Sequence, residues 1–82
     1  MTALAVLGAG AWGSAFAAVM AARHRVHLWA RDPEQTRAIL AARSNQRYLP
    51  GITLPDSLQV SSDLEKSISG AELLIAATPV AA

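Results

Sequence analysis

The chain of 82 residues contains no cysteine and few charged residues, and both shortages exclude classes of site. Without cysteine there is no disulfide, no thiolate nucleophile and no zinc site built on sulfur. Seven basic and six acidic residues leave a net charge of +1, which gives no general attraction to nucleic acid or to an anionic membrane. The two histidines, His24 and His27, have no partner at metal-ligand spacing, so we expect no metal site.

Long apolar stretches are also missing, although 52% of the residues are hydrophobic. The longest segment without a charge, residues 3–22, is interrupted by three glycines and a serine, whereas a membrane-spanning helix needs about 20 steadily apolar residues. The chain does not begin with the basic and then apolar segment of a secretory signal. We therefore expect one small cytoplasmic domain, with no membrane insertion and no nucleic-acid partner.

Short apolar or alternating segments are interspersed with helical patterns along the chain. The sequence predicts strands at residues 4–7, 26–29, 58–61 and 73–77. It predicts helices at residues 11–22, 33–43 and about 63–69. Strands that alternate with helices indicate an α/β fold, in which a parallel, doubly wound sheet is connected by right-handed crossovers.

The segment between the first predicted strand and helix matches the pattern G-x-G-x-x-G. Gly8 allows a tight turn, Gly10 lets the backbone approach a pyrophosphate, and Gly13 lets the helix pack closely on the strand. Because a strand precedes it and a helix follows, the segment is typical of a Rossmann-type site whose helix N-terminus faces phosphates. The alternative is that the glycines serve close packing only. Trp12 either covers the pyrophosphate or packs against a neighbouring domain.

Arg31 and Asp32 follow the second predicted strand, where dinucleotide-binding domains distinguish NAD from NADP. An acidic side chain there binds the ribose 2′-hydroxyl of NAD, whereas an arginine binds the 2′-phosphate of NADP. Asp32 has another role available, because it can cap the following helix, with Pro33 at the first helical position and Gln35 completing a capping box. We therefore assign the 2′-phosphate to Arg31; the alternative is a solvated loop arginine.

Three segments together resemble the bacterial NAD(P)-dependent glycerol-3-phosphate dehydrogenases. They are residues 5–13 (AVLGAGAWG), 28–31 (LWAR) and 45–55 (NQRYLPGITLP). The third is the most particular to the family, since many dehydrogenases share the glycine pattern. Thr78 and Pro79, after the last predicted strand, also look like the family. The resemblance covers essentially the whole chain but only the N-terminal part of such an enzyme.

The resemblance implies that the parent enzyme interconverts sn-glycerol 3-phosphate and dihydroxyacetone phosphate by hydride transfer with NADPH or NADH, for glycerophospholipid synthesis. By position, it implies cofactor contacts for Gly8, Gly10, Ala11, Trp12, Gly13, Arg31 and Tyr48. It places the catalytic lysines and a helical substrate-binding domain beyond residue 82. Residues 1–82 are then a partial NAD(P)-binding domain with no catalytic residue, inactive alone, in a protein that forms a homodimer through the missing domain.

Two other functions are compatible with the same glycine pattern. Another NADP-dependent reductase, such as a hydroxyacid or ketopantoate-type enzyme, would share residues 8–13 and Arg31 but not residues 45–55. A non-catalytic module would hold a nucleotide, or none, and never transfer hydride. In each case we expect Arg43, Arg47 and Lys66 to be surface charges.

Overall fold

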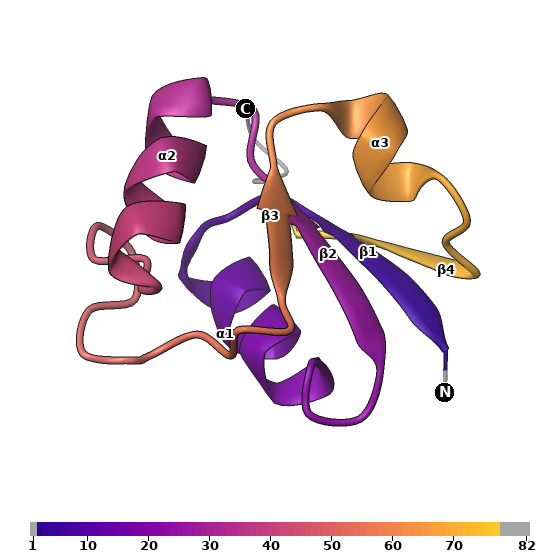
Figure 1. The fold of residues 1–82 in the computed structure, drawn as a ribbon, viewed down its shortest axis with the longest axis horizontal. Coiled ribbons are helices and arrows are strands. Elements are labelled where there is room, and N and C mark those ends of the chain that lie inside the picture. Colours follow the sequence, from indigo (N-terminus) through magenta and orange to yellow (C-terminus); the bar gives the residue numbers. More distant parts are fainter. Residues whose placement is uncertain (1, 78–82) are drawn as a thin grey trace.

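A computed structural model describes residues 2–77 and contains four strands and three helices in alternation (Figure 1). In chain order they are β1 (Ala3–Leu7), α1 (Ala11–Met20), β2 (Arg25–Trp29), α2 (Pro33–Ala42), β3 (Gln59–Ser61), α3 (Leu64–Ile68) and β4 (Leu73–Ala76). Every predicted element is present. Thr78 and Pro79, which follow the last predicted strand and look like the family, lie outside the described residues.

The four strands form one parallel sheet in the order β3-β2-β1-β4. Val6 in β1 pairs with Leu28 on one side and with Ile75 on the other. The order reverses after β3, because the chain crosses from one edge of the sheet to the other to form β4. This arrangement confirms the predicted α/β class with a parallel, doubly wound sheet.

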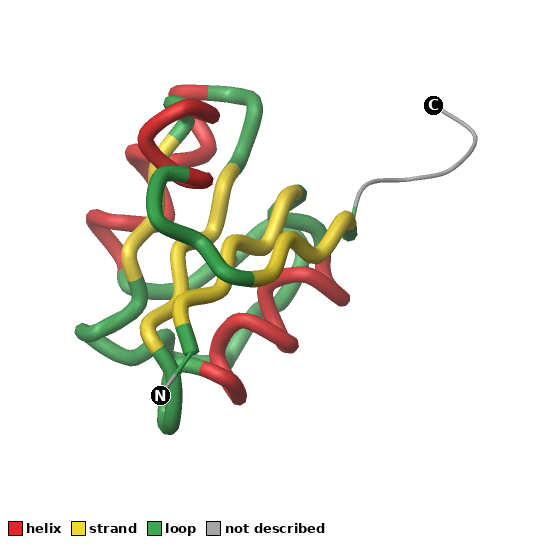
Figure 2. The backbone as a smooth tube through the Cα atoms, turned by 90° about the vertical axis from the view of Figure 1, so that its right-hand side faces the viewer, coloured by secondary structure: helices red, strands yellow, loops and turns green. Residues whose placement is uncertain are grey.

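The core lies between the sheet and its helices. α1 and α3 cover opposite faces of the sheet, and α2 packs beside β3 (Figures 1 and 2). Val6 and Leu28 in the central strands are fully buried, as expected where helices cover both faces. The alanines of α1 allow a close approach, and Ala17 is also fully buried.

The N-terminus of α2 confirms one capping prediction and corrects another. The Asp32 carboxylate accepts a hydrogen bond of 2.9 Å from the Glu34 N–H, and Pro33 occupies the first turn. The capping box is wrong, because Gln35 does not turn back to the Asp32 backbone. Its Nε2 donates instead to the Ala9 carbonyl over 2.9 Å, in the loop before α1.

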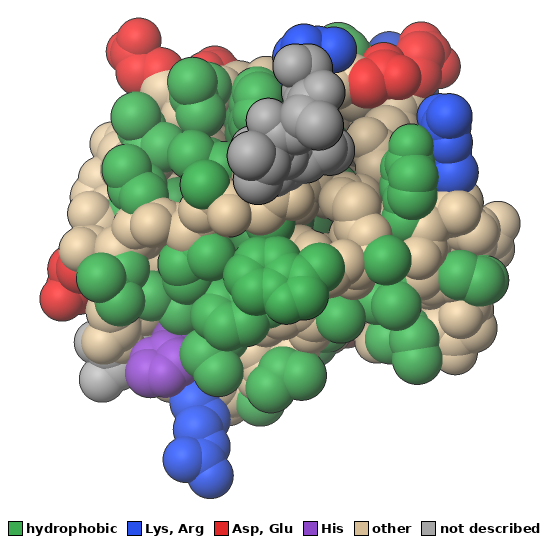
Figure 3. Space-filling view, turned by 180° about the vertical axis from the view of Figure 1, so that it is seen from behind, with side chains coloured by type: hydrophobic (Ala, Val, Ile, Leu, Met, Phe, Trp, Pro, Cys, Tyr) green, Lys and Arg blue, Asp and Glu red, His purple; other side chains and the backbone are tan. Residues whose placement is uncertain are grey.

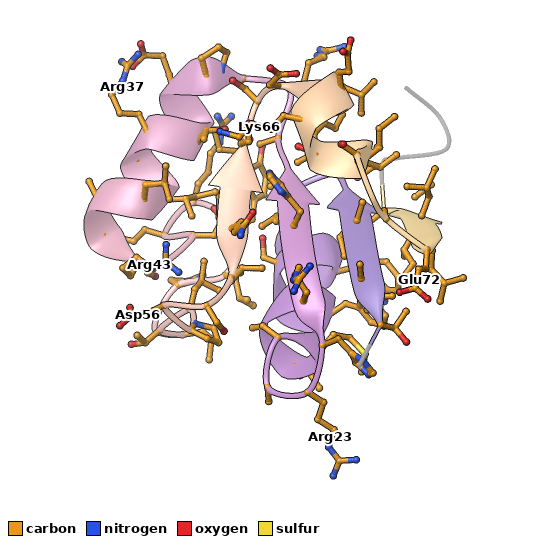
Figure 4. All side chains as sticks on the ribbon, turned by 45° about the vertical axis from the view of Figure 1, so that its right-hand side comes forward. Arg23, Arg37, Arg43, Asp56, Lys66 and Glu72 are labelled. Carbon is orange, nitrogen blue, oxygen red and sulfur yellow. The ribbon has the colours of Figure 1, made fainter. Side chains whose placement is uncertain are left out.

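Arg43 ends α2 and organises the long loop that follows. Its backbone is left-handed, with φ 51°, and its guanidinium donates to the carbonyls of Pro55 and Leu58. The Leu54 N–H donates to the Arg43 carbonyl over 2.7 Å. Figure 4 shows the side chain pointing toward the loop that carries Asp56. The expectation of a surface charge is therefore wrong for Arg43, which joins the two ends of this loop.

Element boundaries differ by a few residues from those predicted. α1 ends at Met20, because the backbone from Ala21 onward turns toward β2, and α3 is limited to Leu64–Ile68 after its Asp63 cap. The described helices, at most 10 residues long, are too short to cross a membrane.

Candidate functional site

A cleft of about 650 Å³ opens at the carboxyl ends of β1 and β2, beside the start of α1. The Gly8 N–H donates to the Trp29 carbonyl over 2.8 Å, so the loop of residues 8–13, hereafter the glycine loop, leaves the sheet at this edge. All but one of the residues predicted to bind cofactor line the cleft: Gly8, Gly10, Ala11, Trp12, Arg31 and Tyr48.

Gly13, the remaining predicted residue, lies beneath the cleft where α1 approaches β1. A Cβ atom at this position would lie 2.1 Å from the Gly8 carbonyl oxygen and 3.0 Å from the Ala77 Cβ. Gly8 itself has φ 119°, which side chains rarely allow. Apart from its two chain neighbours, a Cβ at Gly10 would meet no atom of residues 2–77 within 4 Å, so the space beside that backbone is open to a ligand. The three glycines therefore have three different roles.

The N-terminus of α1 has the properties of an anion site. No side chain caps the helix at Gly10, and its first turn contains no acidic residue. The N–H groups at the start of a helix lack helical acceptors, and the helix dipole adds partial positive charge there. Because the cleft opens at this point, a phosphate group placed in it would meet these donors.

Trp12 forms the wall of the cleft nearest α1. Its ring stacks on that of Phe16, with centroids 5.4 Å apart and planes inclined by 10°. The indole is nevertheless 59% exposed. An aromatic side chain held in place on one face and open on the other is suited to contact a flat or extended ligand.

Two arginines, Arg31 and Arg47, also line the cleft. The guanidinium of Arg47 lies 5.1 Å from the centroid of the Tyr48 ring, a cation–π contact that places it at the cleft. Arg47 is exposed, as predicted for a surface charge, and it also lines the cleft, which the sequence did not indicate. Asp32 also lines the cleft, but its carboxylate is engaged as the cap of α2. Positive charge therefore dominates where the second strand ends.

Two further residues hold the glycine loop, and sequence reasoning gave neither of them this role. Asn45 and Gln35 both donate to the Ala9 carbonyl, over 2.6 and 2.9 Å. Asn45 begins the distinctive segment 45–55, which was a signal of its importance but not of its contact. For Gln35 the local pattern favoured a helix cap, and no local signal could indicate a loop 26 residues earlier.

The cleft has features that suit a dinucleotide. The open backbone at Gly10, the uncapped α1 and the two arginines match the shape and charge of a pyrophosphate with a further phosphate. Among residues 2–77, no three His, Asp or Glu side chains are grouped as metal ligands would be.

Comparison with known proteins identifies the family. The profile described as "NAD-dependent glycerol-3-phosphate dehydrogenase N-terminus" matches residues 3–82. The chain belongs to this family. A glycerol-3-phosphate dehydrogenase [NAD(P)+] of Variovorax paradoxus is 55% identical over 80 residues, which are 96% of this chain and 24% of the relative. The chain thus spans about a quarter of the length of the curated relatives that it matches.

Solved structures agree with this assignment. The glycerol-3-phosphate dehydrogenase of Coxiella burnetii is 34% identical, with a TM-score of 0.85 over 92% of this chain and 23% of its own. That of Plasmodium falciparum is 30% identical, with a TM-score of 0.82 over 93% of this chain and 24% of its own. The family resemblance and the Rossmann-type fold are therefore confirmed, and the family distinguishes this chain from the other NADP-dependent reductases considered.

Proposed function

We propose that this chain is the cofactor-binding part of a dehydrogenase that interconverts sn-glycerol 3-phosphate and dihydroxyacetone phosphate, with NADPH as the preferred reductant. The observation that carries the proposal is the uncapped start of α1, which opens on a cleft lined by two arginines. Membership of the glycerol-3-phosphate dehydrogenase family supports the choice of substrate.

The residues of the cleft bind and orient the dinucleotide. The N–H groups at the start of α1 would hold the pyrophosphate, because the absence of a side chain at Gly10 permits close approach. Trp12 would cover it, Ala11 would contribute its backbone, and Tyr48 would contact the cofactor, since all three residues line the cleft. When bound, NADPH supplies a hydride to the C2 carbonyl of dihydroxyacetone phosphate, and a proton completes the alcohol.

Selectivity for NADPH arises from Arg31. Its exposed guanidinium borders the cleft after β2, where a 2′-phosphate would lie, and Arg47 adds a second positive charge to the same cleft. Asp32 does not compete for a ribose hydroxyl, because its carboxylate caps α2. NADH lacks the 2′-phosphate and therefore gains nothing from the two arginines.

The rest of the proposal concerns the whole enzyme. We place the catalytic lysines and a helical substrate-binding domain outside residues 1–82, so that these residues form a partial NAD(P)-binding domain. We further propose a cytoplasmic homodimer that supplies glycerophospholipid synthesis, with a small phosphate ester as its substrate and no nucleic-acid or membrane partner. The near-neutral net charge of +1 supports the last point.

The activity is tested with the full-length protein that carries this chain. Oxidation of NADPH, followed by its absorbance, should require dihydroxyacetone phosphate and should not occur with 2-oxo acids. A protein that oxidises NADPH with a 2-oxo acid, or that binds NADPH and reduces neither class of compound, would contradict the proposed substrate.

The cofactor preference is tested by Arg31→Ala. Loss of a hydrogen-bonded ion pair with the 2′-phosphate should lower the ratio of kcat/KM for NADPH to that for NADH by about 10- to 100-fold. The matched control is Arg37→Ala, which removes an exposed arginine of α2 whose contact is Glu34, 2.6 Å away. An unchanged ratio in Arg31→Ala would remove Arg31 from the 2′-phosphate site.

A further inference from the structure

Two side chains from different places in the chain bind one backbone oxygen of the glycine loop. Asn45, in the loop after α2, and Gln35, within α2, donate to the Ala9 carbonyl over 2.6 and 2.9 Å. Asn45 is only 1% exposed, and its Nδ2 also donates to the Ser14 hydroxyl over 2.7 Å. The α2 segment thus fixes both the glycine loop and the first turns of α1.

The direction of this carbonyl determines the direction of the next N–H. In a trans peptide the C=O and the N–H point to opposite sides of the chain. When the Ala9 carbonyl points toward Asn45 and Gln35, the Gly10 N–H points away from them. Within residues 2–77 that N–H has no hydrogen-bond acceptor, and Gly10 lines the cleft. The group is therefore free to donate to a ligand.

The glycine loop needs such an external restraint because of its own composition. Glycine has the greatest backbone freedom of any residue, so a segment with Gly8 and Gly10 could rotate the peptide between Ala9 and Gly10. A side chain at Gly10 cannot supply the restraint, since its space has to remain open. Donors that hold the carbonyl in advance reduce the conformational entropy lost when a ligand binds.

We propose that Asn45 and Gln35 are positioning residues that hold the Ala9–Gly10 peptide in the orientation required to bind the cofactor pyrophosphate. This inference rests on the proposed NAD(P)-binding function. It gives the distinctive segment 45–55 a role in cofactor affinity through Asn45, which is buried and does not line the cleft.

Two ligands separate a positioning role from a purely structural one. NADPH contains the pyrophosphate, whereas adenosine 2′-phosphate occupies only the adenosine side of the cleft, near Arg31. With the full-length protein, Asn45→Ala should raise the Kd of NADPH by at least about tenfold, the effect of one lost hydrogen bond to an oriented group. The Kd of adenosine 2′-phosphate should change by less than about twofold, which is no more than a typical substitution at a protein surface causes.

Gln35→Met provides a second variant that keeps the fold if Asn45→Ala is too unstable. Methionine retains the length of glutamine without its donor, and Gln35 is only half-buried. The rise in the Kd of NADPH should be smaller in this variant, about threefold, because Asn45 still holds the carbonyl. The matched control is Gln46→Ala, an exposed neighbour of Asn45, which should change neither Kd.

The outcomes distinguish this proposal from the proposed function. If the wild-type protein binds neither ligand, the NAD(P) site itself is wrong and the positioning role is wrong with it. The other case is a wild type that binds both ligands. If the two variants then lose affinity for NADPH and for adenosine 2′-phosphate to the same extent, or lose affinity for neither, only the positioning role is overturned.

Discussion

The two strands that flank β1, β2 and β4, differ in how far residues 2–77 bury them. On the side of β2, the glycine loop is held by Asn45 and Gln35, and the strands beneath it are buried. On the other side, β4 exposes its apolar residues: Leu73 and Leu74 are each 56% exposed. Figure 3 shows hydrophobic side chains over much of the face opposite to that of Figure 1.

This contrast separates ligand binding from stability. The glycine loop is held by contacts among residues 8–45, and Arg47, Tyr48 and Ala77 complete the lining of the cleft. Strands of a parallel sheet are normally covered on both faces, and β4 is not covered in this way by residues 2–77. We expect a substitution in the glycine loop to weaken cofactor binding, either with or without a loss of stability. A substitution in β4 should instead change how strongly the chain associates with itself.

The largest expected effect comes from Gly13→Ala. Its Cβ would lie 2.1 Å from the Gly8 carbonyl oxygen, a backbone atom that cannot move without displacing α1 from β1. Overpacking of this kind should lower the free energy of unfolding by about 3 kcal/mol or more, measured by urea denaturation. Cofactor binding should be lost together with stability.

Gly10→Ala is the matched control for this prediction. Its Cβ meets no atom within 4 Å in the described part of the chain beyond its two neighbours, and the residue has φ −78°, which alanine adopts readily. Stability should therefore change by less than about 0.5 kcal/mol, while NADPH binding is weakened by the added methyl group. Equal loss of stability in the two variants would contradict the separate roles assigned to these glycines.

Leu74→Lys tests whether the exposed apolar residues of β4 drive association. An apolar edge strand pairs readily with another chain, and a lysine opposes such pairing. In sedimentation velocity, the 82-residue chain should associate with rising concentration, and the variant should remain largely monomeric. Leu40→Lys, at a leucine of α2 that is 43% exposed, is the control and should leave the association unchanged. A monomeric wild-type chain would show that the exposed edge does not drive association.

Local patterns were sufficient for the elements and for part of the cleft. Short apolar runs predicted the strands, and Asp32 with Pro33 predicted the start of α2, because capping depends on adjacent residues. Arg31 was placed at the cleft because it directly follows the second predicted strand. Gln35, Asn45 and Arg47 were not assigned to the glycine loop or the cleft, because their contacts join positions distant in sequence or depend on the path of the loop after α2.

The smallest expected effect concerns His27, on the face covered by α3 and away from the binding edge. Burial and the nearby charge of Lys66 lower the pKa of His27 below its ordinary 6.5, while hydrogen bonding with Gln59 acts in the opposite direction. Arg25 lines the same small pocket as His27 and Lys66, and it adds positive charge there. Between the lowered folded pKa and 6.5, the unfolded chain binds more protons than the folded chain, so stability falls as the pH decreases through this range.

The expected loss is less than about 1 kcal/mol from about pH 7.5 to about pH 5.5, because one half-buried group is involved and water screens its charge. Urea denaturation at the two pH values should show it in the wild-type chain, and His27→Gln should reduce it. His24→Gln, which alters the other histidine, should retain the contribution of His27. Stability that rises on acidification, or falls equally in His27→Gln, would show that His27 is not the group responsible. The affinity of the full-length protein for NADPH should not follow the protonation of His27. The pocket that His27 lines and the cleft at the glycine loop have no lining residue in common.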